Sequence, residues 1–367
     1  MKQDVETEKK KVSTTKRKIN WKVSSTLLVL VLLLLVVIFV SVNFGFIQIP
    51  FQDIFFVFLK KIPFIEDYIT LTPAQVYAEP IILLLRLPRI LSGALVGAAL
   101  ATAGVIFQAM FRNPMADPYT TSASQGAALG AALSIVLGVG ISFFGLNTTP
   151  IFAFVGCIIS VLVVYFISRT GSTVPISTLL LSGIAVGIFE LAIITYLQTI
   201  SGDKLGHLTF WLIGSLSSSR TGWPGVLSII PFILIGVLLA YLLSRDLNLL
   251  TLGEEQAQHL GVNLERSKLF LLILGAVLTG AAVAVSGLIG FIGLMIPHVT
   301  RLLVGPDHRV LLPASILLGA SFLVLCDGIS RMLTTLSQEV PVGVITALIG
   351  VVFFLFLMRK KKRGDAF

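Results

Sequence analysis

The most constraining feature of this sequence is a run of 32 residues, from Leu269 to Thr300, that contains no Asp, Glu, Lys or Arg. A single bilayer crossing needs about 20 consecutive apolar residues. Glycines interrupt the run at Gly287, Gly290 and Gly293. Because a chain inside hydrocarbon must satisfy its backbone polar groups internally, the run predicts two short-linked helices, and hence a polytopic membrane protein.

The composition of the whole chain agrees with this prediction. Hydrophobic residues make up 56% of the sequence and charged residues only 12%, whereas soluble domains carry about 25% charged residues. The first apolar segment, from Ser24 to Phe46, is too long for a signal-peptide core and is followed by no small-residue cleavage site. We therefore expect it to be a retained first helix of an all-α membrane protein.

Ten apolar segments are separated by polar, Gly or Pro residues. They begin near Ser24, Ile81, Gln125, Ile151, Ile176, Gly225, Leu269, Gly290, Leu311 and Pro341. An even number of crossings puts both termini on one side. The first 22 residues hold eight Lys or Arg, and the segment 359–363 holds five, so the positive-inside rule predicts that both termini are cytoplasmic. The net charge of +9 is then an orientation signal rather than a nucleic-acid-binding surface.

These observations predict one membrane domain, residues 23–363, between two tails. Residues 1–22 are rich in Lys, Glu and Thr and are expected to form a disordered cytoplasmic tail, and residues 364–367 form a short C-terminal tail. The longest loops are 47–80 on the outer side and 244–268 on the inner side.

The chain shows an internal repeat at an offset of 183 residues. Seven identities occur in 18 positions, pairing Gly97-Ala98-Ala99, Ala101, Gly104, Ile106 and Pro114 with Gly280-Ala281-Ala282, Ala284, Gly287, Ile289 and Pro297. An offset of five helices makes the two copies run in opposite directions across the membrane, which is typical of transporters. The alternative is that small residues recur because they allow close helix packing.

The sequence lacks the residue patterns of an enzyme. It contains no Walker A sequence, no His-Glu-x-x-His and no Gly-x-Ser-x-Gly. The four histidines lie in loops or at helix ends, and Cys157 and Cys326 lie in apolar stretches without metal-ligand spacing, so we expect packed cysteines and no metal site. If transport is driven by ATP, the ATPase must be another chain.

Two carboxylates lie within apolar segments. Glu190 stands midway along the segment that begins at Ile176, where an unpaired carboxylate is costly. It is expected to line a transport pathway; a role in proton coupling and a structural hydrogen bond are the alternatives. Asp327 lies four residues before Arg331, a spacing that predicts a local ion pair.

The inner loop contains a candidate docking helix. Its residues are Gly253, Glu254, Glu255, Gln256, Ala257, Leu260 and Gly261. The first glycine can open a short helix, the two acids suit its positive end, and the last glycine can stop it. Ala257 and Leu260 would share a narrow apolar face, which could insert into a groove of a cytoplasmic partner or simply lie at the membrane interface.

On the outer side, Arg86-Leu87-Pro88-Arg89 precedes the second crossing, and Pro88 is expected to prevent a clean helix start. Two outward arginines, with Arg331 beside them, suit recognition of partner carboxylates; a solvated helix end is the alternative. The preceding loop contains a stretch rich in phenylalanine, which predicts an amphipathic helix on the membrane surface. Its phenylalanines are Phe51, Phe55, Phe56 and Phe58.

With these motifs in view, the chain from Arg86 to the C-terminus resembles the FecCD family of ABC importer permeases, which move ferric siderophores, haem and vitamin B12. The resemblance is carried by blocks in the same order. They are Arg86 to Arg89, Gly97 to Ala101, Asn113-Pro114-Met115-Ala116-Asp117-Pro118, Ser177 to Gly183, Gly261-Val262, Gly290 to His298, Asp307 to Pro313, and Pro341-Val342-Gly343.

The resemblance implies a non-enzymatic subunit of ten helices in a bacterial cytoplasmic membrane. It would pair with a second permease subunit, the same or a sister chain, and bind no cofactor itself. Two separate subunits would bind ATP and Mg²⁺ inside, and a substrate-binding protein would dock outside. By similarity, the segment from Gly253 to Gly261 would be the coupling helix, and Arg86, Arg89 and Arg331 would pair with acids of the binding protein.

The resemblance also implies that the helix beginning at Ile176 lines the pathway, with Ser177 and Thr178 at its cytoplasmic mouth. A ferric siderophore is the expected cargo because it is the commonest in the family, with haem and cobalamin as alternatives. An ion-coupled secondary carrier is a more distant reading, and a membrane-embedded enzyme is disfavoured by the missing catalytic residues.

Overall fold

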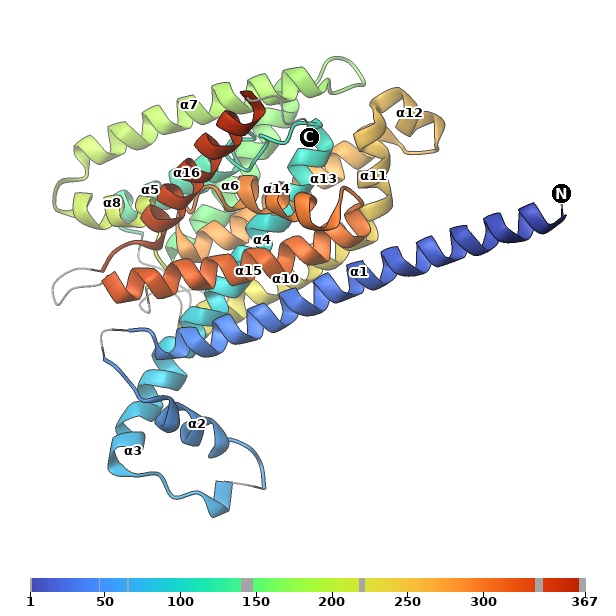
Figure 1. The fold of residues 1–367 in the computed structure, drawn as a ribbon. Coiled ribbons are helices and arrows are strands. Elements are labelled where there is room, and N and C mark those ends of the chain that lie inside the picture. The colour runs from blue at the N-terminus through green and yellow to red at the C-terminus, as the bar shows by residue number, and fades with distance from the viewer. Residues whose placement is uncertain are drawn as a thin grey trace.

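The computed structural model describes residues 2–45, 47–64, 66–139, 148–217, 222–333 and 339–362, and within these ranges the regular structure is helical. Helices long and apolar enough to cross a membrane form a bundle (Figure 1). They are α1 (Lys2–Asn43), the continuous unit of α3 (Pro73–Pro80), η2 (Ile81–Arg86) and α4 (Leu87–Phe111), then α6 (Thr148–Ser168), α7 (Ile176–Ile200), α10 (Trp223–Leu242), α13 (Leu264–Ser286) and α15 (His308–Leu333).

Three shorter apolar helices complete the predicted set. They are α5 (Ala123–Leu137), α14 (Ile292–Val304) and the apolar part, Val342–Leu357, of α16 (Val342–Lys362). The seven long helical segments and these three correspond to the ten segments read from the sequence, so the prediction of a polytopic all-α protein is confirmed. The charge-free run is also confirmed as a hairpin: α13 ends at Ser286 and α14 begins at Ile292. The connection turns at Gly287, which has φ +68°.

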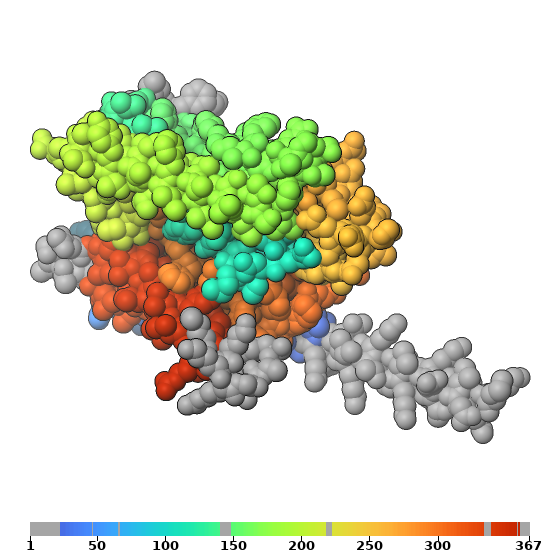
Figure 2. Space-filling view, turned by 90° about the horizontal axis from the view of Figure 1, so that it is seen from above, coloured from blue at the N-terminus to red at the C-terminus, as the bar shows by residue number. Residues whose placement is uncertain are grey.

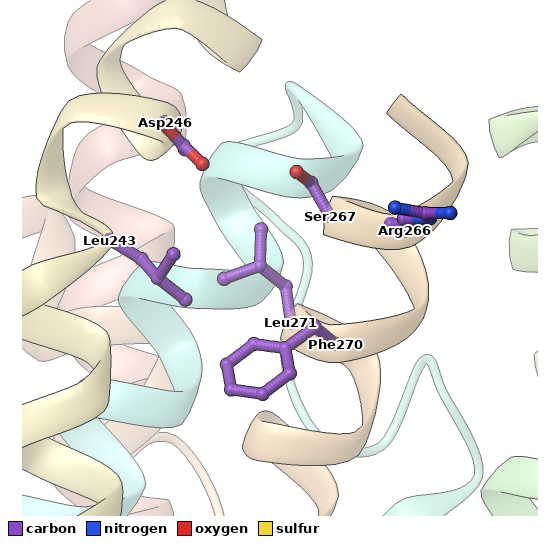
Figure 3. Close-up of a pocket in the computed structure, with 6 residues that line it drawn as sticks. All are labelled: Leu243, Asp246, Arg266, Ser267, Phe270 and Leu271. Carbon is purple, nitrogen blue, oxygen red and sulfur yellow. The ribbon is translucent and has the colours of Figure 1, made fainter. Parts of the chain in front are cut away.

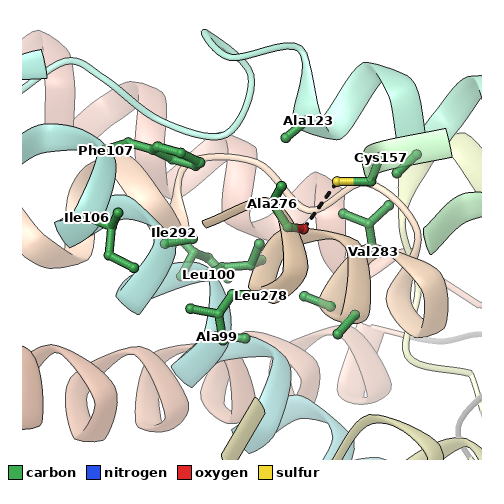
Figure 4. Close-up of a cluster of buried hydrophobic side chains, with 14 of the residues drawn as sticks. Ala99, Leu100, Ile106, Phe107, Ala123, Cys157, Ala276, Leu278, Val283 and Ile292 are labelled. Carbon is green, nitrogen blue, oxygen red and sulfur yellow. Dashed lines mark hydrogen bonds between the residues drawn. The ribbon is translucent and has the colours of Figure 1, made fainter. Parts of the chain in front are cut away.

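Small residues set the packing at the centre of the bundle. A Cβ on Gly104 of α4 would overlap the backbone of Gly293 on α14, and one on Gly97 would overlap the backbone of Gly319 on α15. At both places the backbones therefore touch directly. Figure 4 shows the apolar core around α4 and α13, where the Cys157 thiol donates to the carbonyl oxygen of Ala276 at 3.3 Å.

Cys157 and Cys326 are both free and buried, as expected for packed apolar side chains.

The two ends of the bundle differ. The N-terminus of α1 and the short helix α12 (Glu254–His259) lie at one end, and α2 (Phe51–Leu59) and α3 lie at the opposite end (Figure 1). At the latter end the outer loop folds into a small unit: Thr72 caps α3, and the Gln75 side chain donates to Asp53 of α2 at 2.9 Å. The predicted helix in the phenylalanine-rich stretch is confirmed as α2. Further short helices are η1 (Glu66–Tyr68), η3 (Gly202–Lys204) and α8 (Leu205–Ile213).

Three local expectations differ from the structure. Helix α1 continues through residues 2–22, where we expected a disordered tail; the segment contains neither Gly nor Pro to interrupt a helix propagating from the span. Pro88 does not break the second crossing, because the π-helical segment η2 leads into it and Pro88 occupies the first turn of α4. The inner loop 244–268 is largely helical, since it holds α11 (Ser244–Leu252), α12 and the first turn of α13. Residues 363–367 lie outside the described ranges.

Candidate functional site

The candidate coupling helix is α12. It begins after Gly253, which has φ +124°, and Gly261 follows it with φ +90°. The prediction of a short helix bounded by these two glycines is confirmed. It projects from the end of the bundle where α1 begins, which we call the α12 end, and lies beside α7 (Figures 1 and 2). Glu255, Gln256 and Leu260 are exposed there, and Glu254 is half-buried.

The expected apolar face of Ala257 and Leu260 is wrong. Ala257 is fully buried, whereas Leu260 is 53% exposed. The reason is the turn after α12: the Val262 N–H donates back to the Ala257 carbonyl at 3.0 Å, which folds the chain over this side of the helix. Ala257 therefore anchors α12, and Leu260 remains available to a partner.

A buried cation joins α12 to its neighbours. The ammonium of Lys268, in the second turn of α13, lies 3.1 Å from the Glu254 carboxylate and 3.2 Å from that of Glu265. It also donates to the Val174 carbonyl at 2.9 Å, and the Val174 N–H donates to Glu265 at 2.9 Å. Because Val174 lies two residues before α7 begins, the Lys268 network connects α12 to the start of α7.

A second polar link connects α11 to α15. The Asn248 side chain donates to Asp307 at 2.7 Å and accepts from the His308 backbone N–H at 2.9 Å. Partial burial disfavours the charged form of Asp307, but hydrogen bonds from Asn248 and from the Arg309 backbone hold its pKa below the usual value. Sequence reasoning missed both links. The only available signal was the spacing of Glu265 and Lys268, three residues apart at a helix start.

The predicted pathway residues do not share one surface. Ser177 is exposed and Thr178 half-buried, both at the first turn of α7. Glu190 lies on the opposite, buried side of the helix and is 6% exposed. It faces the packed interior of the bundle, and its buried Oε2 has no hydrogen-bond partner among the described residues. Glu190 therefore lies away from the exposed face of α7, which is largely apolar. That face includes Leu181, Ile188, Phe189 and Tyr196.

The three outer arginines come together, but they are buried rather than exposed. Arg89 lies 2.8 Å from Asp327 and also pairs with Glu339. Arg331 lies 2.9 Å from Asp327, which confirms the predicted ion pair. Arg86, Arg89 and Arg331 are 6%, 8% and 7% exposed. We call these three arginines with Asp327 and Glu339 the outer arginine cluster.

Backbone carbonyls at the end of α1 and in the linker to α2 cover this cluster. Arg86 donates to Val42 at 2.6 Å and to Ile47, and Arg331 donates to Phe44 at 2.7 Å. The expectation of outward-facing arginines is wrong because the sequence did not predict that this linker folds over their side chains. Charge-assisted bonds to its carbonyls hold the guanidinium groups inside.

A cavity of about 430 Å³ lies between α8, the α13–α14 connection and α16. Asp117 and Tyr119, from the connection between α4 and α5, line it together with Gly290 and Phe291. The Asp117 carboxylate accepts the N–H groups of Tyr119 and Thr120 at 3.0 and 3.1 Å. Burial raises the pKa of Asp117 to about 6 despite these bonds.

Across the described residues, no group of three or more His, Cys, Asp or Glu side chains could hold a metal ion.

Comparison with known proteins places this geometry in context. The cobalamin import system permease protein BtuC of Halobacterium salinarum is 46% identical over 78% of this chain and 75% of its own length. The hemin transport system permease protein HmuU of Yersinia pestis is 40% identical over 76% of this chain and 81% of its own. A solved ABC transporter in an inward-facing conformation matches 92% of this chain and 99% of its own, with a TM-score of 0.76 and 31% identity.

The sequence model of the FecCD transport family matches residues 33–360, which is most of the chain. The match covers part of the first crossing, the other crossings, the α12 segment and the outer arginine cluster. The chain therefore belongs to the FecCD transport family and is an ABC importer permease.

Proposed function

We propose that this permease moves a ferric siderophore across the cytoplasmic membrane, driven by ATP that separate subunits hydrolyse. Relatives named as Fe(3+)-citrate and iron(3+)-hydroxamate permeases of Bacillus subtilis are each 38% identical to it. Cobalamin is the second candidate cargo because the archaeal cobalamin permease is 46% identical, and haem is the third. In this proposal both termini are cytoplasmic and the α12 end faces the ATPase.

The observation that carries the mechanism is the Lys268 network. ATP-driven closure of two ATPase subunits would displace α12, and Lys268 would transmit that displacement to α13 and to the start of α7. The link between Asn248 and Asp307 would carry α15 along with α11. With two permease subunits paired across their exposed apolar helices, these movements would expose the pathway to each side in turn.

We propose that the binding protein docks at the opposite end, on the unit of α2 and α3. The outer arginine cluster holds the linker from α1 to this unit. In this arrangement the three arginines support the docking surface and do not themselves pair with the partner's acids.

The test is uptake by proteoliposomes that contain this permease with the ATPase and the binding protein encoded beside it. We expect the vesicles to accumulate a ferric hydroxamate. This accumulation should require ATP on the side of the membrane that carries the ATPase. Vesicles with this chain alone should accumulate nothing. Uphill uptake by the chain alone, abolished when the proton gradient collapses, would establish an ion-coupled carrier instead.

The cargo is tested separately. The purified binding protein is titrated with ferric hydroxamate, haem and cyanocobalamin, and binding is followed by quenching of its fluorescence. The ferric complex should bind most tightly. Tighter binding of cyanocobalamin would assign the second candidate and leave the importer mechanism intact.

A further inference from the structure

Helices α10 and α13 pack side by side and leave a groove between them on the surface of the bundle. One part is a cavity of about 250 Å³ with an apolar lining that includes Phe232, Leu239, Phe270 and Val277. The second part, of about 330 Å³, lies between Leu243, Asp246, Arg266 and Ser267 (Figure 3). Phe270 lines both parts, so they adjoin. We call the whole the α10–α13 groove.

The length of the groove matches one leaflet of a bilayer. From Phe232 to Leu243 the lining extends over eleven residues of helix, or about 16 Å at 1.5 Å per residue. The hydrocarbon core is about 30 Å thick, so this is about half of it. Ile235 and Phe270 on the groove walls are 58% and 45% exposed, which leaves the groove open along its side.

The groove becomes polar only at its end beside α11. In Figure 3 the side-chain oxygens of Asp246 and Ser267 point toward each other across the pocket, and Arg266 extends away along its rim. Within the described part of the chain, neither Asp246 nor Arg266 is engaged in an ion pair. An unpaired carboxylate and a hydroxyl thus meet at the mouth of an apolar groove, and an unpaired guanidinium lies on its rim.

This set of groups fits a zwitterionic headgroup with a cation that can donate hydrogen bonds. A primary ammonium would donate to Asp246, and the adjacent phosphate would accept from Ser267 and Arg266. A choline headgroup has no N–H to donate, and a glycerol headgroup has no cation for Asp246. The acyl chain would cover the apolar side chains of Leu239, Phe270 and Val277.

We propose that the α10–α13 groove binds one phosphatidylethanolamine molecule from the leaflet at the α12 end. With the orientation proposed above, this is the cytoplasmic leaflet. The headgroup would bridge α11 and the first turn of α13, the two elements that flank α12. Bound lipid would therefore brace the base of the coupling helix.

The experiment measures which lipid the intact chain retains. The protein is reconstituted in vesicles made of equal parts phosphatidylethanolamine, phosphatidylglycerol and phosphatidylcholine, extracted in mild detergent, and analysed by native mass spectrometry. We expect one retained phosphatidylethanolamine per chain. Asp246→Asn should lower its retention several-fold, and Asp246→Lys should shift retention toward phosphatidylglycerol. Ile273→Trp, which fills the groove, should lower retention of every lipid.

Leu234→Trp is the matched control for the groove-filling variant. Leu234 lies on α10, the helix that forms the other wall of the groove, is 59% exposed and does not line the groove, so its substitution should leave retention unchanged. Thermal melting and gel filtration of every variant check that it is folded, and Ser267→Ala supplies a milder headgroup variant. Equal retention of the three lipids by the wild-type chain would overturn the proposal. So would retention of phosphatidylethanolamine that is insensitive to both Asp246→Asn and Ile273→Trp.

Discussion

Among single residues, Lys268 makes the most extensive polar contacts at the end of the bundle that carries α12. Its ammonium is buried and shared by Glu254, Glu265 and the Val174 carbonyl. We predict that Lys268→Met lowers the free energy of unfolding by about 1–3 kcal/mol, because two carboxylates lose their partner and a buried carbonyl loses its donor. It should also lower cargo transported per ATP hydrolysed in the assembled importer.

Thermal unfolding and parallel assays of ATP hydrolysis and uptake measure the two effects of Lys268→Met. Arg245→Met, at an exposed position of the same end, is the control and should change neither. A Lys268→Met protein with normal stability and normal coupling would show that the network is incidental.

Asp117 supplies a prediction on pH. Burial raises its pKa to about 6, above the ordinary value of about 3.9. The folded protein then binds the Asp117 proton more tightly than the unfolded chain does, so the contribution of this residue to stability declines as pH rises from about 4 to 6. Melting temperatures measured across this range should fall less for Asp117→Asn, which retains an oxygen to accept the Tyr119 N–H. Parallel curves for the two proteins would contradict the assignment.

Only part of the outer arginine cluster could be predicted from the sequence. The ion pair of Asp327 and Arg331 followed from their spacing on one helix. The second partners, Glu339 for Arg89 and the Phe44 carbonyl for Arg331, come from connections between helices, whose course no periodicity predicts. The position of Glu190 could not be predicted either, because the apolar residues around it surround α7 on all sides and do not distinguish a packed face from an exposed one.

At the scale of elements, α12 presents two apolar residues with opposite surroundings. Ala257 is fully buried and Leu260 is 53% exposed. We predict that Ala257→Leu lowers stability by about 1–3 kcal/mol through overpacking. Leu260→Asp should leave melting unchanged but weaken ATPase assembly, measured by co-purification of the ATPase with the permease. Normal assembly of Leu260→Asp would show that the ATPase binds another part of the segment 244–268.

The helical elements were the most predictable part of the fold. Ten apolar segments became seven long and three shorter apolar helices in the described ranges, and the charge-free run became α13 and α14. Helix α11 was missed because its sequence is only moderately apolar and follows α10 without a proline or glycine. The π-helical turns of η2 were missed because they leave the composition of a helix unchanged.

At the scale of the whole molecule, we propose that the exposed apolar faces of α7 and α16 meet a second permease subunit. Ile188 and Val352 are 64% and 67% exposed there. If the chain pairs with itself, a cysteine at one or other of these positions should form disulfide-linked dimers in membranes, seen on non-reducing gels. Leu234→Cys on α10 should remain monomeric. The native cysteines, both buried, should contribute little background. A dimer that forms only through Leu234→Cys would place the interface on the other side of the bundle.

The carbonyls that cover the outer arginine cluster belong to the end of α1 and the linker after it. The first helix and its linker therefore stabilise the buried arginines as well as crossing the membrane. In a shortened protein beginning at α2, two guanidinium groups would lose their main-chain acceptors, and the periphery that holds α2 and α3 would loosen even though every other crossing remained. Engineered versions of this permease should accordingly keep the first crossing and attach tags ahead of it.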